Sequence, residues 1–241
     1  MQLKTKQLQA WFMHKKKLTL VFLFGAILFC ASTQFTHAQS LGSWTVVNVK
    51  YSFSNKWSVF GEAQIRSQKL YNQFNYYEYK GGVNYTFKKN ITATLGTGSY
   101  QTYRDSGNFK LPKINNEWRV WPQLVIAHNL GMFQLEHRFR AEFRFTSIGY
   151  ANRYRYKIGV LYPISKGKKN FTPLKLGASN EIFVTNRSPY FIRDRVNLLL
   201  YYKPSVAATI QLGYQRQIDY NSNVNIGKDY IFLGLALELK K

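Results

Sequence analysis

The sequence predicts an all-β protein: an antiparallel up-and-down transmembrane β-barrel of about 10 to 12 strands that follows an N-terminal signal peptide. Three observations predict it: one apolar run near the N-terminus, a two-residue alternation through most of the remaining chain, and glutamates confined to one side of that alternation. The 241 residues are 45% apolar, which excludes an intrinsically disordered chain, and the single cysteine excludes a disulfide scaffold. Because only one long apolar run is present, a polytopic helical membrane protein is excluded as well.

Residues 1–38 have the organisation of a cleavable secretory signal peptide. Three lysines at 15–17 form its basic region, 18–31 its apolar region, and 36–38 (Thr-His-Ala) a small-residue cleavage site. The apolar region is too short to make a typical membrane-spanning helix. We therefore expect export of the protein and a mature chain that begins at Gln39.

Two residues within this segment affect its interpretation. Met13 directly precedes His14 and the lysine run, so it is an alternative start that would give a signal of more usual length. Cys30 follows Phe29, where lipoprotein modification needs a small residue, and we do not expect lipidation. Residues 39–241 contain no linker rich in Pro, Gly or Ser, and we expect them to form a single β-barrel domain.

The segment 133–145 (FQLEHRFRAEFRF) shows the alternation most clearly. Its odd positions are apolar except for His137, and its even positions are all polar or charged. A strand sorts alternate residues onto opposite faces, whereas a helix would scatter both classes around its circumference. The run is longer than a usual soluble strand of about five or six residues, and a membrane-crossing strand needs about nine to eleven.

The same alternation predicts eleven strands in the mature chain. They lie near residues 43–54, 56–68, 76–88, 90–103, 116–128, 132–145, 152–163, 173–185, 193–203, 205–218 and 229–239. Turn-forming residues predict tight connections at 54–56, 88–90, 129–131 and 203–205, and longer ones at 69–75, 104–115, 146–151, 165–172, 186–192 and 219–228. Short turns that alternate with long loops are typical of outer-membrane barrels. An odd number of strands is not typical of these barrels. Either one segment is therefore wrongly assigned, or the first strand forms only part of the barrel wall.

The charged residues indicate which face of each strand is the interior. All the glutamates lie opposite the bulky apolar residues of their strands: Glu62, Glu78, Glu117, Glu136, Glu142, Glu181 and Glu238. Most mid-strand cations share that face: Lys50, Arg66, Lys80, Arg119, Arg138, Arg140, Arg144, Arg155, Lys157, Lys175 and Arg195. A soluble barrel or sandwich needs the reverse arrangement, and bulky sets such as Tyr77, Tyr79 and Tyr85 would crowd a small interior. We therefore assign the charged face to the interior and the apolar face to lipid.

Aromatic residues gather near the ends of the predicted strands. The four tryptophans of the mature chain are Trp44, Trp57, Trp118 and Trp121. An indole has an apolar body and a polar tip, which suits the interface between headgroups and acyl chains, so we expect an aromatic girdle. The alternative is that these residues only reflect the aromatic preference of strands.

The order of several segments resembles a known family. These are the strand with Trp44, the Ser-Asn-Lys-Trp turn at 54–57, the segment 133–145 dense in Arg and Glu, and a closing Tyr-x-Phe-Leu-Gly-Leu-x-Leu strand at 230–237. Together they resemble the uncharacterised outer-membrane barrels grouped as domain of unknown function 2490. The resemblance implies a fold and a location, and that family has no settled activity to transfer.

Catalytic and metal-binding constellations are not evident in the sequence. A lipase needs a serine nucleophile within reach of a histidine base, and the mature chain has only His128 and His137, neither followed by the His-x-Ser pattern of outer-membrane phospholipases. Two separated histidines without a cysteine give no metal-ligand cluster, and we expect no cofactor. We expect the protein not to be an enzyme, with an outer-membrane lipase or deacylase as the alternative.

The interior face predicts a network of charged residues. Its members are Arg119, Glu136, Arg138, Arg140, Glu142, Arg144 and Arg155. A turn with Leu130 and Gly131 at its tip would place Arg119 opposite Glu142 and Glu117 opposite Arg144, and the next hairpin would place Arg155 opposite Glu142. Long side chains that simply fill a narrow barrel explain this network, and so does a cation-rich path for anions.

These observations lead to a functional hypothesis. We expect a non-enzymatic protein of the bacterial outer membrane, either structural or a narrow pore for small anionic solutes. The alternatives are an outer-membrane enzyme that modifies lipid or lipopolysaccharide, and a soluble exported β-barrel that binds a ligand. Its expected partners are outer-membrane lipids and, during biogenesis, the barrel insertion machinery. Cations that alternate with lipid-facing residues do not make a nucleic-acid interface, and no oligomeric state is predicted.

Overall fold

The computed structural model describes residues 40–104, 107–110, 112–165, 173–221 and 224–241. The expected signal peptide at 1–38, the alternative start at Met13 and the cleavage before Gln39 lie outside the described residues. No helix in the described part of the chain is long and apolar enough to cross a membrane.

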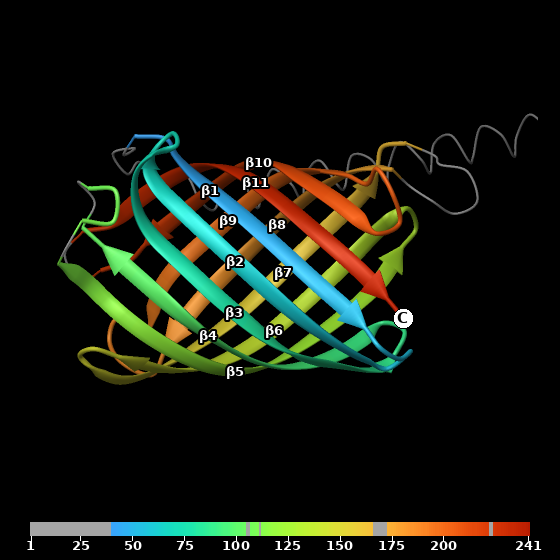
Figure 1. Ribbon diagram of the computed structural model, residues 1–241, viewed down its shortest axis with the longest axis horizontal. Coiled ribbons are helices and arrows are strands. Elements are labelled where there is room, and N and C mark those ends of the chain that lie inside the picture. The colour runs from blue at the N-terminus through green and yellow to red at the C-terminus, as the bar shows by residue number, and fades with distance from the viewer. Residues whose placement is uncertain (1–39, 105–106, 111, 166–172, 222–223) are drawn as a thin grey trace, which may run out of the picture. The chain divides into compact units, whose positions relative to one another are not determined.

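Eleven strands close into one barrel (Figure 1). They are β1 (Gly42–Ser52), β2 (Trp57–Lys69), β3 (Asn72–Lys88), β4 (Ile91–Tyr103), β5 (Lys113–Leu130), β6 (Phe133–Thr146), β7 (Gly149–Pro163), β8 (Leu174–Thr185), β9 (Phe191–Tyr202), β10 (Ala208–Asp219) and β11 (Ile226–Lys240). Strands that follow one another in the sequence are hydrogen-bonded neighbours in the wall. The all-β barrel of 10 to 12 strands is confirmed, and each of the eleven predicted segments corresponds to one strand.

The closing pair, β1 and β11, departs from the fully antiparallel barrel that we expected. These two strands run parallel and lie side by side in Figure 1. A ring with an odd number of strands requires one parallel pair when all other neighbours are antiparallel. Moreover, β1 is a full wall element, because Gly42 to Ser52 all pair with β11 and Ser43 to Ser52 also pair with β2. Neither explanation that we gave for an odd count is therefore needed.

The interior of the barrel is polar. Among the described residues, 16 polar or charged residues are buried and only eight hydrophobic ones. The outer wall carries exposed apolar residues, such as Tyr79 at 61%, Leu95 at 63% and Leu212 at 51% relative exposure. The alternation of each strand thus places its charged face inward and its apolar face outward, as a strand's two-residue period requires.

Several connections differ from those predicted. The segments 69–75 and 146–151 were expected to be long loops, but only 70–71 and 147–148 separate the strands there. The strands continue because residues such as Asn72 and Gly149 pair with the neighbouring strand. Beyond the apolar band a strand is as polar as a loop, so composition does not mark its end. The expected alternation of short turns with long loops is therefore wrong.

The predicted register is wrong by two residues at both hairpins of β6. Arg119 pairs with Arg144 rather than with Glu142, and Glu142 pairs with Arg153 rather than with Arg155. At the first hairpin the turn residues are 131–132, and Gly131 has a φ of +60°. Glycine with positive φ at the first central position is the requirement of a type II′ turn, so the turn begins one residue later than expected. A slip of two residues leaves every side chain on its face.

Candidate functional site

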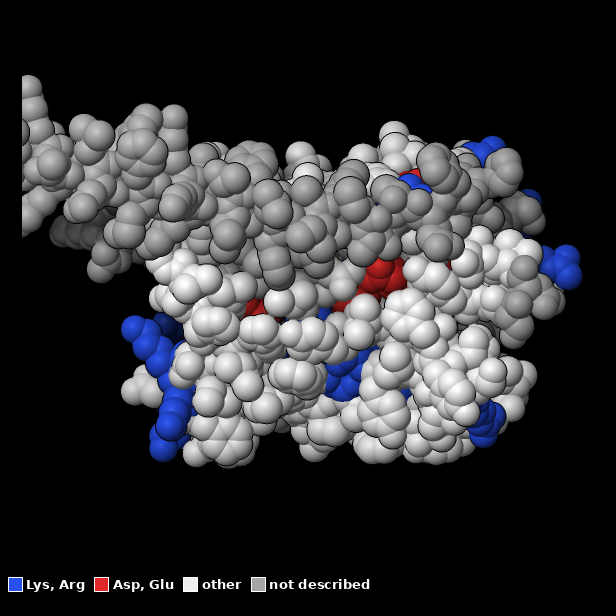
Figure 2. Space-filling model, turned by 180° about the vertical axis from the view of Figure 1, so that it is seen from behind, with Lys and Arg blue, Asp and Glu red and all other residues white. Residues whose placement is uncertain are grey.

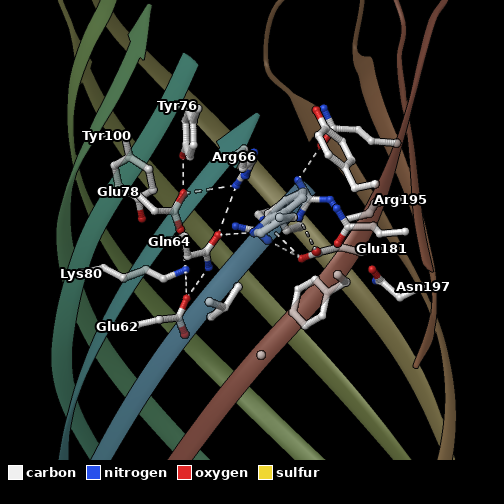
Figure 3. Close-up of a pocket in the computed structure, with 18 of the residues that line it drawn as sticks. Glu62, Gln64, Arg66, Tyr76, Glu78, Lys80, Tyr100, Glu181, Arg195 and Asn197 are labelled. Atoms are coloured by element: carbon white, nitrogen blue, oxygen red, sulfur yellow. Dashed lines mark hydrogen bonds and ion pairs between the residues drawn. The ribbon is translucent and has the colours of Figure 1, made fainter. Parts of the chain in front are cut away.

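The barrel encloses a cavity of about 530 Å³. Inward residues from every strand line it. In Figure 3, Glu62, Glu78 and Lys80 lie on one side of the cavity, and Glu181 and Arg195 lie on the other. These side chains belong to two ion-pair clusters, which differ in net charge.

The first cluster, on β2 and β3, is neutral. The Lys80 ammonium lies 2.5 Å from a carboxylate oxygen of Glu62 and 2.7 Å from one of Glu78. Arg66 contacts the second oxygen of Glu78 at 3.3 Å. Two cations thus face two glutamates, and each charge has a partner of opposite sign. We call this group the neutral cluster.

The second cluster, on β5 to β9, is centred on shared glutamates. Glu142 is fully buried and accepts from Arg153 at 2.5 Å and from Arg155 at 2.6 Å. Arg140 and Arg119 lie 3.6 Å and 3.8 Å from the same carboxylate. One glutamate therefore holds four arginines from β5, β6 and β7 together.

Two further glutamates extend this cluster. Glu117 on β5 accepts hydrogen bonds from Arg119 on the same strand, at 2.7 Å, and from Arg144 on the neighbouring strand β6. Glu181 on β8 contacts Arg138 at 2.7 Å, Arg155 at 2.7 Å and Arg195 at 3.4 Å. Because Arg155 binds both Glu142 and Glu181, the pairs form one continuous network.

This second cluster carries a surplus of positive charge. Its nine cavity-lining cations in the described residues are Arg119, Arg138, Arg140, Arg144, Arg153, Arg155, Lys157, Arg193 and Arg195. Only three glutamates lie within 4 Å of any of these cations, namely Glu117, Glu142 and Glu181. Asp219 adds an ion pair to Arg193 at the edge of the group. We call it the cationic cluster.

Aromatic rings occupy the space between and beside the clusters. The Trp44 ring centroid lies 3.3 Å from the Arg66 guanidinium and 4.7 Å from that of Arg195, so it bridges the neutral and cationic clusters. Phe183 on β8 lies within 4.9 Å of both Arg155 and Arg195. Such contacts between cations and ring faces are most favourable away from water, and Trp44 and Phe183 are only 3% and 1% exposed.

The position of Trp44 corrects part of the aromatic-girdle prediction. Trp44 and Trp121 point into the barrel and are buried, whereas Trp57 and Trp118 are about half exposed on the outer wall. The sequence placed all four near strand ends without distinguishing their faces. Trp44 and Asn48 lie on the same face of β1, because alternate residues of a strand share a face. Asn48 donates a hydrogen bond to Glu62, so this face is the inward one, and the alternation of β1 could have identified Trp44 as an inward residue.

The structure brings together most of the residues that we predicted for the charge network. Six contribute ion pairs to it: Arg119, Arg138, Arg140, Glu142, Arg144 and Arg155. Glu136 does not, because no cation of the described chain lies within 4 Å of its carboxylate. Glu142 contacts Arg119 and Arg155 as expected, but diagonally rather than directly across the ladder.

Other members of the network were not assigned to it from the sequence. Arg153, whose guanidinium donates twice to Glu142, was not recognised as inward although it shares the parity of Arg155. Glu181 and Arg195 were expected to face inward, but the contact of Glu181 with Arg138 on β6, two strands away, depends on how the wall curves. The alternation of β7 therefore contained the signal for Arg153, and no local pattern contained the contacts of Glu181.

The histidines lie on the outer wall. His137 Nδ1 lies 2.8 Å from the Tyr156 hydroxyl, and its ring stacks on that of His128 at 5.3 Å. In the described part of the chain no serine is hydrogen-bonded to either histidine, and no three residues of the His, Cys, Asp and Glu types are grouped as a metal site would need.

Removing the Glu142 carboxylate charge tests whether it holds the cationic cluster together. We expect Glu142→Gln to lower the free energy of unfolding by about 3 to 5 kcal/mol, because four arginines lose a fully buried counterion. Glu136→Gln is the matched control on the same face of β6 and should change it by less than about 1 kcal/mol. Denaturant unfolding of both purified variants measures the difference. Equal losses would show that the cluster does not depend on Glu142.

Comparison with known proteins identifies a family and shows a distant structural likeness. No curated protein sequence matches this chain. The solved structures that it resembles include one titled "LpxR from Salmonella typhimurium", at 7% identity and a TM-score of 0.46, over 75% of this chain and 83% of that one. A family model described as "Protein of unknown function (DUF2490)" matches residues 41–227, which include the neutral cluster and the cationic cluster. The chain therefore belongs to the family DUF2490, as the order of its segments suggested.

Proposed function

We propose that this chain is a β-barrel of the bacterial outer membrane, without enzymatic activity, whose interior is held together by ion pairs. One observation carries the proposal: exposed apolar side chains cover the wall while charged ones fill the interior. In the described part of the face in Figure 2, uncharged residues predominate, Lys and Arg lie towards both ends, and some charged residues are also visible near the middle. Soluble monomers rarely expose contiguous apolar patches above a few hundred Å².

The dimensions of the strands support a membrane-crossing barrel. The shortest strand, β1, has 11 residues and the longest, β5, has 18. A tilted strand needs about nine to eleven residues to cross the hydrocarbon layer. Every strand is therefore long enough, and the closed ring leaves no edge with unpaired backbone groups, which lipid does not tolerate. The proposed partners are outer-membrane lipids and the insertion machinery that such barrels require.

The ion pairs of the interior support a structural barrel over an open channel. Trp44 spans from Arg66 to Arg195, and Glu142 is enclosed by four arginines. These contacts link side chains of several strands across the interior, and Trp44 and Glu142 are only 3% and 1% exposed. A narrow path for small anions is the second candidate, and the charge surplus of the cationic cluster favours it.

Location and conduction are tested with the exported protein in cells and then in planar bilayers. We expect recovery in the outer-membrane fraction, a shift in gel mobility between unboiled and boiled samples, and no steady conductance. Anion-selective conductance would favour the second candidate instead. Recovery in the soluble periplasm would contradict the membrane assignment, and release of labelled acyl chains from phospholipid or lipopolysaccharide would contradict the absence of enzymatic activity.

Two adjacent residues of β10 test which face meets lipid. Leu212 is 51% exposed on the outer wall, whereas Gln211 lines the cavity at nearly the same depth. Leu212→Arg should make folding into lipid vesicles less favourable by about 2 to 4 kcal/mol, since a charge at mid-membrane depth faces hydrocarbon. Gln211→Arg introduces the same side chain on the polar side and should cost far less. A larger loss for Gln211→Arg would reverse the assigned faces.

A further inference from the structure

Three pairs of cations lie directly opposite each other across neighbouring strands of the cationic cluster. They are Arg119 with Arg144, Arg138 with Lys157, and Arg140 with Arg155. Like charges at directly opposed positions of an antiparallel ladder destabilise the sheet. In a barrel interior with little exposed side chain, each pair needs a nearby negative charge.

Glutamates supply that charge to two of the three pairs. Glu117 accepts hydrogen bonds from both Arg119 and Arg144, with one bond from each at 2.7 and 3.0 Å. Glu142 lies between the members of another pair, 2.6 Å from Arg155 and 3.6 Å from Arg140. The protein has therefore placed one acid beside each of these two repulsive contacts.

In the described chain, no acid lies within 4 Å of both members of the third pair. Arg138 reaches Glu181, but that carboxylate also serves Arg155 and Arg195. Lys157 stands opposite Glu181 in the ladder, yet no acidic oxygen of the described residues lies within 4 Å of its ammonium. Three arginines thus share the Glu181 carboxylate, and Lys157 has no ion-pair partner within 4 Å in the described chain.

Two of the arginines that contact Glu181 also have hydrogen-bond donors without an acceptor in the described part of the chain. Arg138 and Arg195 use terminal nitrogens to bind Glu181, and in each the Nε–H is buried without a hydrogen-bond partner among the described residues. Both arginines and Lys157 line the cavity. A buried charged donor without an acceptor lowers the stability of the fold. In the described chain, Arg138, Arg195 and Lys157 each have N–H groups that could still donate to a bound ligand.

We propose that the cavity binds a tetrahedral oxyanion of the phosphate class beside Arg138, Lys157 and Arg195. Such an anion has several acceptor oxygens, so it can accept from guanidinium and ammonium groups together and offset more than one positive charge. The inference goes beyond the proposed function, because it needs the interior of the folded barrel and neither its membrane location nor conduction. Inorganic phosphate and the phosphate ester of a larger molecule share this chemistry.

Thermal unfolding of the folded barrel in detergent tests the site. Phosphate is exchanged for chloride at constant ionic strength, and the unfolding midpoint and the heat of binding are measured. We expect a saturable rise in the midpoint and one bound phosphate per chain. Parallel titrations with glycerol 3-phosphate separate the sources: equal or tighter binding indicates a phosphate ester, and binding of phosphate alone indicates the free ion.

Variants show whether the named residues form the site. Lys157→Gln should weaken phosphate binding at least about tenfold, the loss expected for one charge-assisted contact. Without phosphate, it should be at least as stable as the unmodified protein, because the repulsion from Arg138 is removed. Arg138→Lys retains the charge but lacks the Nε–H donor, and it should also bind at least about tenfold more weakly.

The matched control is Lys50→Gln on β1, which removes an equal charge from an inward position that does not line the cavity. It should bind phosphate like the unmodified protein. Phosphate and glycerol 3-phosphate that act no differently from chloride would overturn the proposal. So would unchanged binding in both Lys157→Gln and Arg138→Lys, or an equal loss in Lys50→Gln. None of these results would alter the fractionation or the conductance that test the proposed function.

Discussion

The structure depends on a few buried glutamates that are shared by many arginines. The two-residue period of each strand leaves one face for the exterior, so the charges of the other face are enclosed when the barrel closes. Glu142 joins arginines of β5, β6 and β7, and Glu181 joins those of β6, β7 and β9. These contacts cross-link strands that backbone hydrogen bonds connect only to their immediate neighbours.

The interior is electrostatically uneven, and this has a functional consequence. The neutral cluster on β2 and β3 balances its charges locally, whereas the cationic cluster does not. Trp44 lies between them with a guanidinium on each side. The interior therefore combines ion pairs bridged by an aromatic ring with one wall that retains positive charge, which suits retention of an anion better than free passage.

The sequence predicted the faces of the strands better than their partners. Alternation placed Glu142 and Arg155 on the charged faces of their strands, and the bulk of the apolar faces assigned the charged ones to the interior. Neither step depends on how the strands pair. The register depended on which residue of the Gly131 turn comes first, and an error of one residue there moved the ladder by two. The contacts of Glu181 with Arg138 join strands that are not neighbours, and no pattern within one strand encodes them. Trp44 was misassigned because an indole suits both an interface and a cation-lined interior.

Accessibility along β6 in lipid vesicles tests the central claim most directly. The only cysteine of the sequence is Cys30, so a protein that begins at Gln39 can carry a nitroxide label at single introduced cysteines from Phe133 to Phe145. The account predicts that dissolved oxygen, which concentrates in lipid, relaxes labels at odd positions more strongly than labels at even ones. Absence of a two-residue period, or higher oxygen accessibility at the even positions, would contradict an apolar exterior around an ion-paired interior.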